Sequence, residues 1–229
     1  MPSTSHDRDA SSVEKSRVEV LGSNNETQPP ATKGRSRFAN PTPAGLFMFA
    51  SSTFLISMYN VNARGIHTPN AITGMALFGG GLVQILAGTW EFARGNVFGA
   101  TTFSSYGAFW MSYSAILIPG TGVHQAYSTE AEFHNAYGMY LIVWFMVTMM
   151  FILPTLPRKH LAMTLLLSCL AIDYLLLAIS EFSGMISIQR AGGAFGIITA
   201  FVAYYIASSD LLAADENPFI VLPQGIWTN

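Results

Sequence analysis

The chain has 229 residues, of which 51% are hydrophobic and only 10% are charged, and its mean hydropathy is +0.38. A soluble domain has about one quarter charged residues, so this composition excludes an ordinary soluble protein. The net charge of −2 and the pI near 6.2 exclude a basic nucleic-acid-binding face. The single cysteine, Cys169, excludes an intrachain disulfide and a cysteine-based metal site.

The N-terminal segment, residues 1–37, is polar and shows no apolar period, which predicts a disordered tail. Most of the charged residues lie in this tail or in short segments between apolar runs. Such a distribution is typical of a membrane protein, because a charged side chain in the hydrocarbon core is energetically costly.

Six apolar runs follow the tail, and each has close to the ~20 residues that cross a bilayer core of about 30 Å. Six such runs in succession predict an all-α membrane protein with six transmembrane helices, rather than a set of buried helices in a soluble domain. The predicted organisation is a tail (1–37), a transmembrane domain (38–210) and a C-terminal tail (211–229). The runs are Pro43 to Asn60, Ala71 to Phe92, Phe98 to Ile118, Phe133 to Leu153, His160 to Ile179 and Ile188 to Ala207.

The basic residues beside the runs predict the orientation, because cytoplasmic segments carry an excess of Lys and Arg. The tail side of the membrane has six of them, which are Lys33, Arg35, Arg37, Arg94, Arg158 and Lys159. The other side has only Arg64 and Arg190. We therefore expect both termini to be cytoplasmic.

The second run has small and polar residues on one helical face, which are Thr73, Gly80, Gln84, Ala87 and Glu91. We expect this face to point at other helices or at a cavity, because small and polar faces avoid lipid. Gln84 is the most informative of them, since a lone amide in lipid is costly. For Gly80 the alternative is simple helix packing, and for Glu91 it is contact with water or with Arg94.

Two other runs also carry polar groups. In the third run Thr102, Tyr106, Phe109 and Tyr113 share one face, which suits packing better than ligand binding, although the mid-span hydroxyl of Tyr106 needs a partner. Asp173 lies well inside the fifth run. An intramembrane acid is often a proton relay, and the alternative is a hydrogen-bonded structural acid.

Neither a metal ion nor a fixed cation is predicted inside the membrane. The histidines of the loops show no metal-ligand spacing, and we expect no cofactor. No Lys or Arg lies near the middle of any run. A bound anion would therefore depend on amides, hydroxyls and helix N-termini. This favours a small, weakly acidic solute that crosses partly neutralised.

Several motifs in order resemble those of a known family. The segment Asn40-Pro41-Thr42-Pro43-Ala44-Gly45-Leu46 resembles the Asn-Pro-Ala-Pro-Leu-Gly-Leu signature of the acetate uptake transporter family, with departures at Thr42 and Ala44. That family includes bacterial succinate-acetate permeases and fungal acetate and ammonia-linked transporters. The similarity covers about residues 39–210, and the long polar tail is similar to the fungal branch. It continues through Gly79 to Gly88, Glu91, Gly95-Asn96, Phe98-Gly99 and Phe103 to Trp110.

The resemblance implies six helices around a narrow pathway in the plasma membrane, commonly in a homohexamer. Each subunit would have its own route for acetate, and sometimes for propionate, succinate or lactate. The family's hydrophobic constriction would be formed by Phe49, Tyr106 and Leu170, and Ala203 would tune substrate size. Asp173 falls where bacterial relatives look apolar, so the resemblance assigns it no role.

These observations give a hypothesis for transport. The exposed N–H groups at the head of the first run would attract a carboxylate, which would bind beside Asn40 and Pro41. Gln84 and the hydroxyl of Thr102 would replace part of its water. A bare carboxylate in the dry constriction would be far more costly than the protonated acid, so we expect protons to accompany the substrate, with Glu91 or Asp173 as candidate proton or polar groups.

Three alternatives remain open at this stage. One is a passive channel for a neutral solute such as ammonia or acetic acid. Another is a membrane receptor that binds acetate and signals through residues 1–37. An enzyme is disfavoured, because the sequence offers no arrangement of nucleophile, base and orienting group.

Overall fold

The structure is a computed structural model that describes residues 39–157, 160–215 and 217–225. The described residues belong to one compact unit, which spans residues 38–229. The predicted disordered tail and its basic residues lie outside the described residues, as do Arg158 and Lys159. The described residues form helices, turns and connecting segments without a strand.

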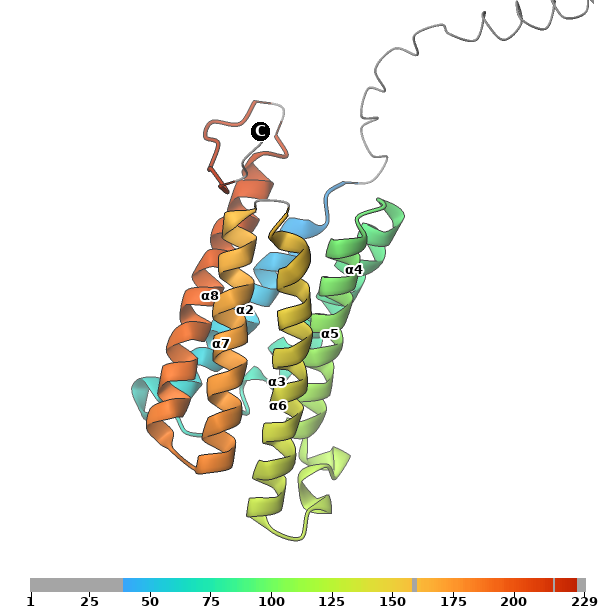
Figure 1. Cartoon of the computed structure of the whole chain (residues 1–229). Coiled ribbons are helices and arrows are strands. Elements are labelled where there is room, and N and C mark those ends of the chain that lie inside the picture. The colour runs from blue at the N-terminus through green and yellow to red at the C-terminus, as the bar shows by residue number, and fades with distance from the viewer. Residues whose placement is uncertain (1–38, 158–159, 216, 226–229) are drawn as a thin grey trace, which may run out of the picture. The chain divides into compact units, whose positions relative to one another are not determined.

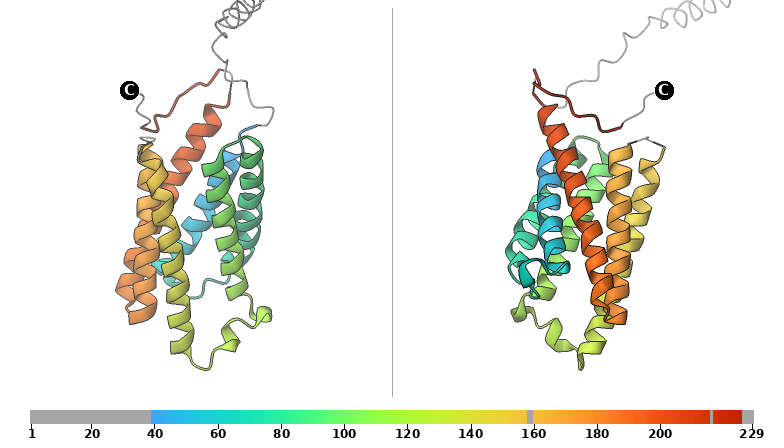
Figure 2. Two further views of the ribbon diagram at one scale, coloured as in Figure 1. Left: turned by 45° about the vertical axis from the view of Figure 1, so that its right-hand side comes forward. Right: turned by 90° about the vertical axis from the view of Figure 1, so that its left-hand side faces the viewer.

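The described residues form six long helical segments. These segments lie roughly parallel to one axis, and successive segments run in opposite directions (Figures 1 and 2). The second segment is composite and consists of α3, η2 and α4, of which η2 has π-helical hydrogen bonding. Each of the six apolar runs thus corresponds to one segment. The segments are α2 (Thr42–Asn60), α3 (Ile72–Gly74) with η2 (Met75–Val83) and α4 (Gln84–Ala93), α5 (Val97–Leu117), α6 (Glu130–Ile152), α7 (Leu161–Ser183) and α8 (Ile186–Leu212).

The connections contain short 3₁₀ turns, and local chemistry sets where the helices begin and end. α6 begins three residues before its apolar run, because the Thr129 hydroxyl accepts from the backbone N–H of Glu132 and caps the helix. α7 ends at Gly184, whose φ of +68° is a left-handed cap that favours glycine. The 3₁₀ turns are η1 (Ala63–Gly65), η3 (Pro119–Thr121), η4 (His124–Ala126) and η5 (Leu153–Thr155).

Four of the helical segments are long and apolar enough to cross a membrane, namely residues 72–93, 130–155, 161–183 and 186–212. α2 and α5 have 19 and 21 residues, which at 1.5 Å per residue gives lengths of about 28 and 31 Å. They are long enough, but their many hydroxyl side chains lower their hydropathy. By length and apolar composition, four of the six predicted transmembrane helices are therefore candidate membrane spans.

The C-terminal segment folds back onto the bundle. The carbonyls of Gln224 and Gly225 accept from the backbone N–H groups of Ala162 and Leu161, at the start of α7. The first N–H groups of a helix have no partner within it, so this segment satisfies two of them. Ser209 of α8 donates to the Leu222 carbonyl and fixes the same segment from the other side.

Packing divides into close backbone contacts and contacts through large side chains. α2 packs on α8, α8 on α7, α7 on α6, and α4 with η2 on α5. α5 meets α6 and α7 through aromatic rings centred on Phe109, which contacts Tyr140 and Trp144 of α6 and Tyr174 of α7. Aromatic side chains therefore line the interior on the α5 side of the bundle.

Glycines permit the close approach of α4 and η2 to α5. An added Cβ at Gly107 would lie 3.0 Å from both the Gly81 carbonyl oxygen and the Ile85 backbone nitrogen. Small residues at such positions are typical of helix pairs in membranes, where they bring backbones together.

Gly107→Ala should therefore destabilise the protein by about 1–3 kcal/mol, as overpacking does. The two obstructing backbone atoms cannot move aside without separating the helices. The measurement is the Tm of the purified protein in detergent. Gly74→Ala is the matched control, because nothing lies within 4 Å of a Cβ at Gly74. Equal Tm values for the two variants would contradict close packing at Gly107.

Candidate functional site

Among the described residues, one cavity lies toward each end of the bundle. The Thr42 cavity has a volume of about 80 Å³ and lies at the end where α2 begins, with Gln84, Thr102 and Leu166 among its walls. The Asp173 cavity has a volume of about 320 Å³ and lies toward the end with the η1 and η4 turns. Its walls include Thr53, Tyr113, Tyr137, Leu170 and Asp173.

Buried apolar side chains lie between the two cavities. The rings of Phe49 on α2 and Tyr106 on α5 are 5.6 Å apart, and both line the Thr42 cavity. Leu170 on α7 belongs to the same buried cluster and lines the Asp173 cavity. The three residues assigned by resemblance to the constriction are 2–4% exposed. Their role in transport stays a prediction.

Tyr106 has the hydroxyl partner that its mid-span position requires. Its oxygen lies 3.0 Å from Oγ1 of Thr148 on α6. The Thr148 hydroxyl donates to the carbonyl of Trp144, so Tyr106 must be the donor to Thr148. The signal for this partner was Thr148 itself, a hydroxyl within the apolar sequence Met146 to Ile152.

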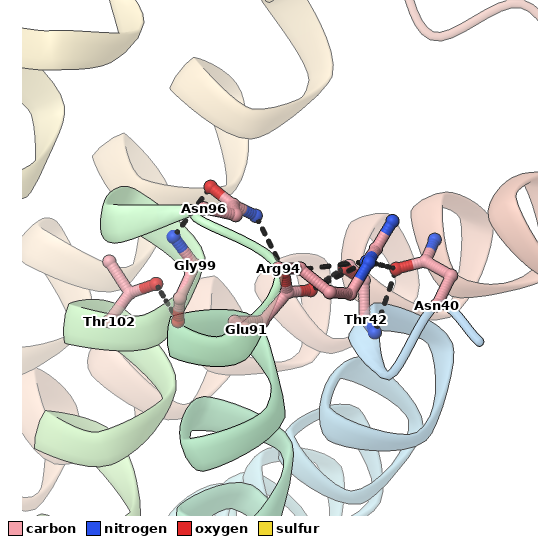
Figure 3. Close-up of polar contacts among 7 residues, drawn as sticks. All are labelled: Asn40, Thr42, Glu91, Arg94, Asn96, Gly99 and Thr102. Atoms are coloured by element: carbon pink, nitrogen blue, oxygen red, sulfur yellow. Dashed lines mark hydrogen bonds and ion pairs between the residues drawn. The ribbon is translucent and has the colours of Figure 1, made fainter. Parts of the chain in front are cut away.

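A polar cluster joins three helix ends beside the Thr42 cavity, and Glu91 is at its centre (Figure 3). The Glu91 side chain is fully buried at the end of α4. Its carboxylate accepts from Thr42 Oγ1 at 2.5 Å and from Asn96 Nδ2 at 3.0 Å. Arg94 lies 3.4 Å from the same carboxylate. Charge-assisted bonds of this kind offset the cost of burying the charge.

The same cluster shapes the starts of α2 and α5. Asn40 Oδ1 accepts from the Thr42 backbone N–H at 3.2 Å and from Arg94 at 2.5 Å. Asn96 Oδ1 accepts from the Gly99 N–H at 3.2 Å and caps α5. Pro41 has no N–H, and its carbonyl accepts from the N–H of Gly45. The head of α2 therefore uses the Thr42 N–H in its own cap, so a role for this N–H in attracting substrate has no geometric support.

Gln84 presents an acceptor to the Thr42 cavity. Its side chain is fully buried, and Nε2 donates to the Gly80 carbonyl at 2.7 Å. Only the amide nitrogen can occupy that position, because an amide oxygen there would face another oxygen. Oε1 is the remaining atom, and it is buried without a hydrogen-bond partner among the described residues.

The hydroxyls that line the same cavity are also donors to other groups. Thr102 Oγ1 donates to the Phe98 carbonyl at 2.8 Å, and Thr42 Oγ1 donates to Glu91. A hydroxyl whose proton is already donated can offer only its acceptor lone pairs. Together with Gln84 Oε1, these groups give the Thr42 cavity several hydrogen-bond acceptors, and Gln84 Nε2 has a second N–H besides the one that the Gly80 carbonyl accepts.

Other predicted site residues lie apart from this cavity. Asp173 is 4% exposed and lines the second cavity, and its Oδ1 has no hydrogen-bond partner within the described residues. Ala203 on α8 is fully buried in the apolar core and lines neither cavity. Among the loop histidines, His134 pairs with Glu181 at 2.6 Å and His124 with Glu130 at 3.4 Å.

Comparison with known proteins follows this geometry. Residues 23–227 match the model of the GPR1/FUN34/yaaH family. The chain belongs to this family. The resemblance drawn from the motifs is thereby confirmed.

Relatives from fungi and bacteria share most of the chain. This chain is 42% identical over 186 residues to Accumulation of dyads protein 2 of Saccharomyces cerevisiae. The aligned region spans 81% of this chain but only 65% of that protein. The chain is also 40% identical to Acetate permease A of Emericella nidulans, over 82% of this chain and 66% of that one. The Succinate-acetate/proton symporter SatP of Escherichia coli is 34% identical over 84% of this chain and 98% of its own. A solved structure of the bacterial acetate channel SatP is 33% identical and covers 82% of this chain and 100% of its own, with a TM-score of 0.70.

Removing the charge at the centre of the polar cluster should destabilise the bundle. In Glu91→Gln the partly exposed Arg94, Asn96 and Thr42 lose the charged acceptor that the buried Glu91 provides, which should cost about 1.5–3 kcal/mol. The Tm in detergent measures this. Glu130→Gln is the matched control, because that acid is 73% exposed and should change stability little. A Glu91→Gln protein as stable as the wild type would show that the cluster does not hold the helix ends.

Proposed function

We propose that the protein transports acetate and similar short-chain monocarboxylates, with succinate as a possible further substrate, and that protons accompany the substrate. The observation that carries this proposal is the group of acceptors at the Thr42 cavity, of which Gln84 Oε1 is buried without a partner among the described residues. Acetic acid brings an O–H that Gln84 Oε1 or the Thr102 oxygen can accept. Acetate brings only acceptors, so it would meet unpaired lone pairs in a water-poor site.

The constriction supports the same preference. A solute between Phe49, Tyr106 and Leu170 would have apolar walls on most sides, and the Tyr106 proton is already donated to Thr148. An ionised carboxylate there would lose its water without replacement, whereas the neutral acid loses much less. Short carboxylic acids have pKa values of about 4–5, so the neutral form is more abundant in mildly acid medium.

The proposed membrane arrangement has six spans, with α2 and α5 added to the four apolar segments. α2 and α5 have sufficient length, and their buried hydroxyls face other helices rather than lipid. Both termini are proposed to be cytoplasmic, in the plasma membrane, and the assembly to be a homohexamer, as the family resemblance implies. The positions of Arg64 and Arg190 at the end opposite Arg94 suit that orientation. Nothing in the proposal requires a cofactor or an enzymatic step.

A passive channel is the second candidate, and one observation favours it. The similar solved structure is described as that of an acetate channel, whereas the E. coli relative is named a proton symporter. The two mechanisms differ in net charge movement. Acetate with one proton is electroneutral, and acetate alone carries negative charge.

Flux in liposomes should separate these mechanisms. We expect protein-dependent uptake of labelled acetate to rise with an inward proton gradient and to ignore a potassium diffusion potential of either sign. Liposomes without protein supply the background from acetic acid that crosses lipid directly. Uptake that follows the potential and ignores the proton gradient would establish an anion channel. Acetate binding without flux would favour a receptor.

The constriction should set substrate size. Leu170→Ala removes a buried side chain beside the Asp173 cavity, so uptake of lactate and succinate should increase relative to acetate. Leu165→Ala is the matched control on the same helix, because Leu165 is 47% exposed and does not line either cavity. Unchanged substrate preference in Leu170→Ala would remove Leu170 from the constriction.

A further inference from the structure

Asp173 is an acid without a counter-charge in the interior of the bundle. Its side chain is 4% exposed, and Oδ1 has no hydrogen-bond partner among the described residues. A buried ionised carboxylate without a partner is strongly unfavourable. A structural acid would instead be tied by donors, as Glu91 is. The contrast between the two acids indicates that Asp173 binds a proton or a ligand that is exchanged, and not a permanent partner within the protein.

Neighbouring helices leave room around the carboxylate. An added Cβ at Gly196 on α8 would meet both Asp173 Oδ2 and Ser57 Oγ. The glycine therefore gives Oδ2 space next to Ser57 of α2. The hydroxyls of Ser57 and Thr53 are buried and, like Asp173, have no partner in the described part of the chain. Three polar side chains with spare hydrogen-bonding capacity thus gather beside one cavity.

The cavity beside them is large enough for a short carboxylic acid. It has a volume of about 320 Å³, and Asp173 and Thr53 both line it. No Lys or Arg of the described residues is among its walls, so no fixed cation holds a carboxylate there. The other titratable side chains that line it are His67, Tyr113, His134, Tyr137, Tyr174 and Glu181. Glu181 is already paired with His134, which leaves Asp173 as the acid with a free acceptor.

We propose that Asp173 is the proton-binding residue of transport, and that its protonated form binds the substrate carboxylate in the Asp173 cavity. The inference rests on the proposed function and names the group that carries the proton. A hydronium ion at the cavity mouth transfers its proton to the carboxylate of Asp173 and leaves a water molecule. The resulting O–H then donates to one oxygen of acetate.

Proton transfer follows within that hydrogen bond. The O–H bond on Asp173 breaks as an O–H bond forms on acetate, which leaves an aspartate and a neutral acetic acid. No electrons are exchanged, and one proton moves with each acetate. An aspartic acid and a short carboxylic acid have similar intrinsic acidity, so the transfer is nearly balanced. The neutral acid then meets the dry constriction and, beyond it, the acceptors of the Thr42 cavity.

The test uses the full chain in liposomes and two assays of labelled acetate. One is uptake driven by an inward proton gradient, and the other is exchange against internal unlabelled acetate at equal pH. In Asp173→Asn we expect both activities to fall to the level of protein-free liposomes, because the bound acetate then receives no proton before it meets the dry constriction. Glu181→Gln is the matched control in the same cavity and should keep both activities.

A spectroscopic measurement keeps the inference separate from the proposed function. The infrared band of a protonated carboxylic acid should appear in the wild type, shift when acetate is added, and be lost in Asp173→Asn. Asp173→Ser serves as a second neutral variant if the asparagine protein does not fold. Gradient-driven uptake in either folded neutral variant equal to that of the wild type would overturn the inference, even if transport is proton-coupled. If wild-type flux does not respond to the proton gradient, the proposed proton coupling is wrong. Absence of the infrared band would then also overturn the assignment of Asp173 as the proton-binding residue.

Discussion

The carboxylate of Glu91 joins three helices by hydrogen bonds, and the proposed pathway depends on the positions that these bonds give them. A buried acid needs several donors, and here they come from the start of α2, the end of α4 and the start of α5. Phe49 follows Thr42 by about two helical turns and Tyr106 follows Asn96 by about three. The contact at Glu91 therefore sets the register that brings the rings of Phe49 and Tyr106 to 5.6 Å.

The two sides of this ring contact differ in hydrogen-bonding character. On one side, the Thr102 hydroxyl and one amide N–H of Gln84 donate to backbone carbonyls, and Gln84 Oε1 and the Thr102 oxygen are left as acceptors. On the other side lies Asp173, an acid that can exist with or without a proton. A solute that gains its proton beside Asp173 becomes the form that the acceptor side accommodates. Proton coupling in this proposal needs no moving domain. The substrate gains its proton beside Asp173 and reaches the Thr42 cavity as a neutral acid.

Much of the fold could be predicted from the sequence, because the positions and lengths of the hydrophobic runs determine which segments form the long helices. Gln84 could also be singled out, since an amide in an apolar helix must face inward. The contacts of Asn40 and Thr42 with residues 94 and 91 could not, because they join positions about 50 residues apart and depend on how α2 packs beside α4. The expectation of free N–H groups at the head of α2 neglected the Asn40 side chain, which accepts from Thr42 locally. Leu166 and Leu167 were missed as cavity walls because nothing in an evenly apolar helix marks which leucines face a pathway.

The helices with the weakest membrane signal are the ones that contribute most polar groups to the interior. In α2 the hydroxyls of Ser52, Thr53 and Ser57 are buried, and in α5 those of Thr102 and Ser114 are. These side chains lower the average hydropathy, yet none of them needs to face lipid, because α8, η2 and α4 pack against α2 and cover it. A span that lines a polar pathway must be less apolar than one that only faces lipid. The residues that lower the hydropathy of α2 and α5 include Thr53 and Thr102, and these two line the Asp173 cavity and the Thr42 cavity.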